Sequence, residues 1–139
     1  MRKIILSMLL CLSLLLSLGA LSEQTVDMDL TELDASDAIE ALFRLTEAPE
    51  DNRGKVVRLT GNFSYVSWDD GELFLLYGGG GASCCGAQLE FIPANTPENL
   101  EQLTLSNEPI TVHGVLDIYE NYGYDTIRLI EAQIEDADL

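Results

Sequence analysis

The stretch "KVVRLTGNFSYVSW", residues 55–68, has the alternating pattern of a long β-strand. Its apolar side chains recur at every second position, which places them on one face of an extended chain. These side chains are Val57, Leu59, Phe63 and Tyr65. Gly61 interrupts the series near its centre, and a glycine inside a long strand usually marks a bulge or a sharp bend. The stretch therefore predicts one strand that bends near its middle.

Four further strands are predicted after this stretch. Asp70 and Gly71 are typical of a tight hairpin turn, because both residues accept the positive φ angles that such turns need. In the third strand the alternation points Leu89 and Phe91 toward the core. The four predicted strands are residues 72–77, 87–92, 110–119 and 124–134.

A helical link separates the third and fourth predicted strands. Thr96 could cap a turn of helix that begins at Pro97, with Leu100 and Leu103 facing inward. A bent first strand and a link at this position are features of the oligonucleotide/oligosaccharide-binding barrel, the OB-fold. We therefore predict a mainly β domain over residues 37–139, a five-stranded OB-fold-like Greek-key barrel with a short N-terminal helix. A two-sheet sandwich is the alternative architecture.

Upstream of the barrel, the sequence predicts a short helix and a tether. In "SDAIEALFRL", residues 36–45, Ser36 can serve as the N-cap and acidic residues fall in the first turn. The apolar face of this helix would consist of Ile39, Leu42 and Phe43. Residues 23–36 are acidic and weakly patterned, so we expect them to form a tether.

The first 22 residues have the layout of a secretory signal peptide. A basic start, "MRK", precedes an apolar run of eighteen residues, and small residues come before the first acid. Cleavage after Ala20 or Ser22 suits the small-residue rule. The alternative is a membrane anchor, since eighteen apolar residues are just enough to span a bilayer. We expect a secreted or cell-envelope protein, attached to the membrane only if this segment stays uncleaved.

The charge balance is strongly acidic, with 24 acidic residues, 7 basic residues and a net charge of −17 at pH 7. Loss of Arg2 and Lys3 with the signal peptide would bring the mature charge to about −19. Such a surface repels phosphates and anionic lipids, so nucleic acid is not an expected partner. The charge also keeps an exported protein soluble. An envelope protein or a small ligand is the kind of partner that we expect.

Two adjacent cysteines stand in a glycine-rich segment, "YGGGGASCCGAQLEF", residues 77–91. Cleavage of the signal peptide removes Cys11 and leaves Cys84 and Cys85. In a regular strand their sulfur atoms would point to opposite faces. The flanking glycines accept conformations that let both sulfurs lie on a bent loop. The simpler interpretation is a plain loop, with Cys85 a small core residue and Cys84 an exposed thiol.

Three kinds of chemistry would use both cysteines. They could form a strained and easily reduced disulfide, hold a soft metal such as zinc or copper(I), or bridge to a second chain. Zinc takes about four ligands. His113, the only histidine, and Glu90 are the further candidates, and both are expected to face outward. Each is also an ordinary residue for the solvated face of a strand.

Other motifs point to binding more than to catalysis. No Ser–His–Asp set, phosphate loop or helical pair of metal-binding histidines is present in the sequence. Aromatic residues could form a platform on which an OB-fold stacks sugars or bases, although their even spread suits packing at the core edge and hairpins better. They are Tyr65, Trp68, Tyr77, Tyr119, Tyr122 and Tyr124.

Three segments together resemble a group of small, uncharacterised exported or lipid-anchored bacterial proteins that have a predicted OB-fold. The segments are "GKVVRLTGNF" (54–63), "CCGAQLEF" (84–91) and "ITVHGVLDIYE" (110–120). A similar double-cysteine segment occurs in the C-terminal part of proteins encoded beside predicted permeases. The resemblance covers about residues 37–134 and implies the fold and the cysteine site, but no activity. The sequence lacks the cysteine to which its lipid-anchored relatives attach lipid.

The sequence thus predicts an extracytoplasmic, non-catalytic binding or accessory domain with Cys84 and Cys85 as its site. The alternative is a thiol–disulfide redox or soft-metal handling protein that works through the same pair, with zinc or copper as the metal. In that case His113 and Glu90 would complete the ligands.

Overall fold

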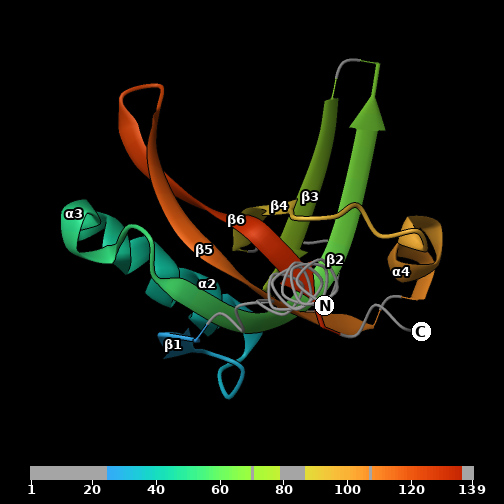
Figure 1. Ribbon diagram of the computed structural model, residues 1–139, viewed down its shortest axis with the longest axis horizontal. Helices are drawn as coiled ribbons and strands as arrows, with labels where there is room; N and C mark the ends of the chain where they lie inside the picture. Colours follow the sequence, from blue (N-terminus) through green and yellow to red (C-terminus); the bar gives the residue numbers. More distant parts are fainter. Residues whose placement is uncertain (1–24, 70, 79–86, 107, 136–139) are drawn as a thin grey trace, which may run out of the picture.

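The computed structural model describes residues 25–69, 71–78, 87–106 and 108–135. The predicted signal peptide, residues 1–22, and the two adjacent cysteines lie outside these residues. The described chain consists of strands and a few short helices (Figure 1). The elements are β1 (Met28–Asp29), α2 (Ala35–Phe43), the 3-10 helix η1 (Arg44–Glu47), α3 (Pro49–Asn52), β2 (Val56–Trp68), β3 (Gly71–Tyr77), β4 (Gln88–Pro93), α4 (Leu100–Ser106), β5 (Pro109–Asn121) and β6 (Tyr124–Ile134).

The strands form one mixed sheet in the order β1-β2-β3-β4-β6-β5. Because β2 also pairs with β5, the sheet closes on itself as a ring. The β1–β2 and β4–β6 pairs are parallel, and the other pairs are antiparallel. The prediction of a mainly β fold is confirmed. The described residues hold six strands where five were predicted, and the additional one is β1.

The long strand β2 closes the ring because it pairs with two different strands. Residues 56–62 pair with β5, and residues 62–68 pair with β3. The exchange of partners occurs beside Gly61, where the sequence predicts a bend. A Cβ atom on Gly61 would lie 3.3 Å from both Leu76 Cβ and Tyr77 O. Close approach of β3, and not an unusual φ angle, is therefore the reason for a glycine at this position.

Alternation along the strands fills the ring with apolar side chains. Helix α2 packs against β2 and β6, and α4 packs against β2. The largest fully buried side chains are Ile39, Leu42, Val57, Leu59, Leu76, Leu89, Phe91, Ile110, Val112, Leu116, Ile118 and Leu129. Phe43, expected on the buried face of α2, is 39 % exposed, because that face is centred on Ala38, Ile39 and Leu42 instead.

The segment expected to be a tether is partly docked on the sheet. Within residues 23–36, Asp27 N donates to Val56 O at 2.9 Å and Leu30 N donates to Arg58 O at 2.8 Å. Met28 and Leu30 pack against the core. Their spacing of two places both on one face of an extended segment, which explains why this short stretch forms β1.

Two helix starts differ from their predicted positions. The N-cap of α2 is Asp34 and not Ser36, because the Asp34 side chain accepts a hydrogen bond from Asp37 N at 3.0 Å. Helix α4 begins at Leu100, three residues after the predicted start at Pro97, and Leu103 is buried as predicted. No helix among the described residues is long and apolar enough to cross a membrane.

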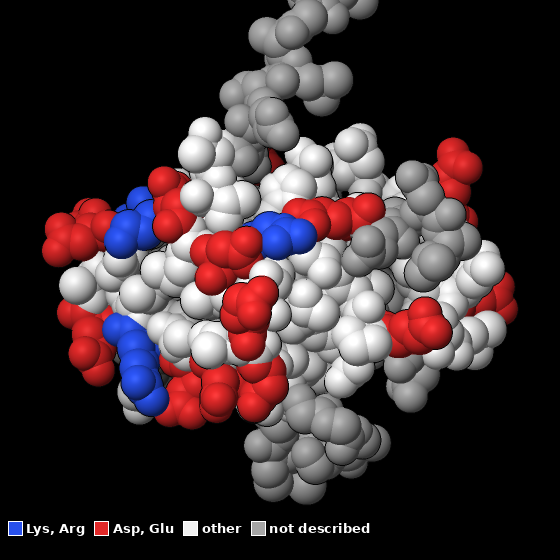
Figure 2. Space-filling view, turned by 90° about the horizontal axis from the view of Figure 1, so that it is seen from below, with Lys and Arg blue, Asp and Glu red and all other residues white. Residues whose placement is uncertain are grey.

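Acidic side chains dominate the surface seen in Figure 2, with few lysines and arginines between them. This distribution agrees with the net charge of −17. The surface therefore attracts cations and repels anions over distances of about a Debye length, roughly 10 Å at 0.1 M salt.

Candidate functional site

The predicted cysteine site lies between β3 and β4, and Cys84 and Cys85 are outside the described residues. The structure does describe both ends of this connection. Gly78 N donates a hydrogen bond to Ala87 O at 2.9 Å. A Cβ atom on Gly78 would collide with the backbone of Ser36, in the first turn of α2. Gly78 and Ala87, the described residues on either side of the cysteine segment, therefore form a closed backbone pair, and Gly78 packs against this helix.

His113 faces outward on β5, as predicted, and belongs to a charged network that we call the Arg58 network. Its Nδ1 atom is 3.0 Å from Glu135 Oε1. Arg58 forms a bidentate ion pair with Glu135, with Nε–Oε1 at 2.8 Å and Nη2–Oε2 at 2.7 Å. Arg58 Nη1 also reaches Asp29 Oδ2 at 3.1 Å. These four residues join β1, β2, β5 and the end of β6.

The Arg58 network changes the acidity of its carboxyl groups. Hydrogen bonds from Arg58 lower the pKa of Glu135 most, and the hydrogen bond with His113 lowers it further. The pKa of Asp29 is also lowered, first by the side chain and backbone N–H of Thr31 and then by Arg58. Both carboxylates are therefore stabilised in their charged form by specific donors.

Glu90 points away from the core and belongs to a second network. Its Oε2 atom accepts a hydrogen bond from the Tyr119 hydroxyl at 3.1 Å. The Arg128 guanidinium lies 4.3 Å from the centroid of the Tyr119 ring, and Arg128 Nε donates to Asp117 Oδ2 at 2.9 Å. Burial, followed by the negative charge of Glu90, raises the pKa of Tyr119. This network joins β4, β5 and β6 on their outer face.

The structure does not bring Glu90 and His113 together. Glu90 pairs with Tyr119, which lies six positions from His113 along β5, or roughly 20 Å at the rise of an extended strand. A metal ion bound by both side chains would have to draw at least one of them away from its present partner. Among residues 25–69, 71–78, 87–106 and 108–135, no group of three or more His, Cys, Asp or Glu is arranged to hold a metal ion.

A hollow of about 300 Å³ opens where β3 and β4 separate. The β3–β4 pairing ends at Phe74 and Phe91. Beyond this point β4 follows β6, since Pro93 pairs with Ala132 and Ala94 N donates to Ala132 O at 2.8 Å. Proline has no backbone N–H with which to continue a ladder.

A bulge in β6 accompanies this separation. Glu131 has a φ angle of 52°, and the pairing of β6 shifts by one residue here with both β4 and β5. Gly114 faces the bulge on β5, where a Cβ atom would lie 3.1 Å from Ala132 Cα and from Ile130 O. The extra residue bends β6, as bulges do. The bend lies where β4 stops pairing with β3 and continues alongside β6.

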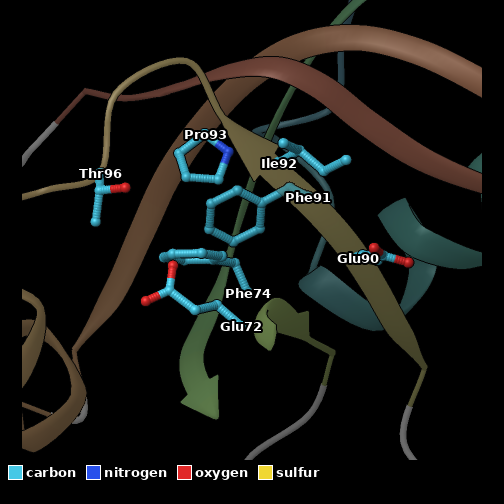
Figure 3. Close-up of a pocket in the computed structure, with 7 residues that line it drawn as sticks. All are labelled: Glu72, Phe74, Glu90, Phe91, Ile92, Pro93 and Thr96. Atoms are coloured by element: carbon cyan, nitrogen blue, oxygen red, sulfur yellow. The ribbon is translucent and has the colours of Figure 1, made fainter. Parts of the chain in front are cut away.

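The hollow has an aromatic floor and a carboxylate at its rim (Figure 3). Seven described residues line it: Glu72, Phe74, Glu90, Phe91, Ile92, Pro93 and Thr96. In the close-up, Phe74, Phe91 and Glu72 lie together, whereas the Glu90 carboxylate points away from them. The Tyr65 hydroxyl donates to Glu72 Oε1 at 2.7 Å, and this bond is the main reason that the pKa of Tyr65 is raised.

The sequence patterns do not indicate this hollow as a site. Phe74 and Phe91 follow from strand alternation as core residues, and both are buried. Pro93 at a strand end is the local signal that pairing stops there. The predicted aromatic platform is not formed as one surface, because Tyr65 packs on Phe74, whereas Trp68 and Tyr122 are exposed on two different hairpins.

Comparison with known proteins adds no assignment to this geometry. No protein-family model matches the chain, and no curated protein matches it.

Proposed function

We propose that this chain is an extracytoplasmic, non-catalytic binding or accessory domain with an OB-fold-like barrel, and that Cys84 and Cys85 form its site. Support for the barrel comes from the strand order: β2, β3 and β4 form a meander, α4 precedes β5, and β5 pairs with both β6 and β2. In this proposal β1 is an addition to the five strands of the OB-fold. Proteins with this fold bind many different ligands, so the class of ligand has to be inferred from the residues of the site and not from the fold.

The observation that carries the proposal is the closed base of the cysteine segment. The Gly78–Ala87 hydrogen bond and the packing of Gly78 on α2 fix the two residues that flank this segment. Fixed ends reduce the conformational entropy that a loop loses when it binds a ligand. A double-cysteine segment presented in this way is suited to a joint role for its two thiols.

Intact-mass spectrometry of the protein recovered from the cell envelope or medium tests this proposal. We expect a mature chain that begins between Leu21 and Gln24. Under denaturing, non-reducing conditions its mass should be lower than that of the dithiol by two hydrogen atoms, or a metal adduct should be present in the native spectrum. Cys11→Ser is the control and should leave the mature mass unchanged, because Cys11 leaves with the signal peptide.

Two freely titratable thiols without metal, in protein purified in air, would rule out the joint site. A dimer mass that is lost on reduction would instead mark a bridge between two chains. An intact Met1 in the membrane fraction would show that the N-terminal segment is not cleaved and anchors the protein in the membrane.

A thiol–disulfide redox or soft-metal handling role is the second candidate function. It is favoured by the two adjacent cysteines themselves, since such a pair can form a strained, easily reduced disulfide or supply two thiolate ligands to a soft metal. Titration of the purified protein with glutathione redox buffers distinguishes this role, because a strained disulfide is reduced at a higher potential than a structural one. Resistance of the disulfide to reduction, together with no zinc or copper in the native mass spectrum, would exclude the redox or metal role and favour the binding or accessory role.

A further inference from the structure

The floor of the hollow between β3 and β4 is a fixed aromatic surface. The ring centroids of Phe74 and Phe91 are 5.7 Å apart, and the two side chains are 6 % and 1 % exposed. Phe63 packs against both rings, with centroid distances of 6.5 Å and 6.1 Å. Such a cluster of tilted rings is rigid and apolar. Little of either ring is exposed, so the two rings offer a small but fixed apolar contact at the base of the hollow.

Tyr65 holds the carboxylate at the rim of the hollow in place. The Tyr65 ring packs on Phe74 with a centroid distance of 5.1 Å, and its hydroxyl donates to Glu72 Oε1 at 2.7 Å. Glu72 thus has a defined position beside the aromatic floor (Figure 3). A carboxylate carries a full negative charge, so it attracts a cation to the rim of the hollow.

The charge around the hollow has one sign. Its seven described lining residues include no lysine, arginine or histidine, and Glu72 is the one whose carboxylate lies beside the aromatic floor. The net charge of −17 adds a field that raises the local concentration of cations and lowers that of anions. An anionic ligand would meet repulsion here, whereas a cation would be attracted both locally and at a distance.

We propose that this hollow binds a small organic cation, namely a protonated primary amine on a short apolar or aromatic body. The ammonium group pairs with Glu72, and the apolar body covers the floor formed by Phe74 and Phe91. A volume of about 300 Å³ lies at the lower end of the range for small-molecule pockets, which suits a ligand of about ten non-hydrogen atoms. This site goes beyond the proposed function, because it uses neither cysteine.

The test is titration of the mature protein with 2-phenylethylammonium, followed by NMR chemical shifts of the backbone amides. We expect a dissociation constant on the order of 1 mM for a ligand of this size. The largest shifts should come from Leu73, Ile92 and Thr96. The neutral isostere 2-phenylethanol should bind at least fivefold more weakly, and 3-phenylpropionate should not bind measurably.

Two variants that remove the same charge separate the hollow from the general acidic surface. Glu72→Gln should weaken 2-phenylethylammonium binding at least fivefold, whereas Glu50→Gln should change it less than twofold, because Glu50 is exposed on α3 and does not line the hollow. Equal effects of the two variants, or equal binding of the amine and the alcohol, would overturn the proposal. Unchanged binding by Cys84→Ser/Cys85→Ser protein is expected and shows that this site stands apart from the cysteine site.

Discussion

At the scale of single residues, Glu135 shows how one side chain can join strands that are distant in sequence. Its carboxylate accepts hydrogen bonds from Arg58 on β2 and lies within hydrogen-bonding distance of His113 on β5. Alternation predicts that His113 faces outward, but not that it meets a residue 22 positions away. The partner depends on the pairing of β5 with β6, including the one-residue shift at the bulge. Contacts of this kind are set by register, which local sequence patterns do not contain.

The lowered pKa of Glu135 predicts a loss of stability in acid. A carboxyl whose pKa is lower in the folded than in the unfolded state adds stability above its unfolded pKa, about 4.3, and that contribution disappears as the pH falls through its folded value. Glu135→Gln should therefore lower the melting temperature by a few degrees at pH 7. The difference from wild type should shrink below about pH 4.

Circular dichroism melts at several pH values measure this effect. Glu101→Gln, on the exposed side of α4, is the control for the change in net charge and should have little effect at any pH. A constant difference between Glu135→Gln and wild type from pH 7 to pH 3 would show that the ion pair with Arg58 is not its source.

Gly78 should be less tolerant of alanine than Gly61. A Cβ atom on Gly78 would collide with backbone atoms of α2, which cannot move as a side-chain end can. On Gly61 the nearest atoms would be 3.3 Å away, so small shifts would suffice. We expect Gly78→Ala to cost about 1–3 kcal/mol in the free energy of unfolding and Gly61→Ala clearly less. Urea denaturation of both variants tests this order, and a smaller cost at Gly78 would contradict the packing of α2 on this glycine.

At the scale of elements, the strands that follow β1 were predictable, because β2, β4, β5 and β6 carry a period-two apolar pattern and β3 is a short apolar run after a hairpin turn. Two features were not. The strand β1 has only two residues, and it forms because Met28 and Leu30 pack against the core. This packing is a tertiary contact, which local sequence patterns do not contain. The bulge in β6 places Glu131 at a positive φ angle, which a non-glycine residue seldom adopts. The hollow that depends on this bulge was therefore also beyond prediction from sequence.

The shared strand β2 predicts a graded response to side-chain size at Gly61. Valine adds two methyl groups beyond the Cβ position that is already 3.3 Å from Leu76 Cβ and Tyr77 O. We expect Gly61→Val to lower the free energy of unfolding by about 1–3 kcal/mol. Ser64→Val, which adds the same side chain on the outer face of β2, should change stability by about 0.5 kcal/mol or less. Equal melting temperatures for Gly61→Val and wild type would show that β3 does not approach β2 this closely.

At the scale of the whole molecule, the ring depends on contacts between segments far apart in the chain. Residues 56–62 of β2 pair with residues 109–115 of β5. If the chain is exported from its N-terminus, as we propose, the first half of β2 emerges well before its partner β5. Until β5 follows, the edge of β2 that β5 covers is unpaired, and an unpaired strand edge is the kind of surface that aggregates or recruits chaperones. In an exported chain the ring would therefore close only after residues 109–115 have crossed the membrane, and a chain cut off before residue 109 could not close the ring.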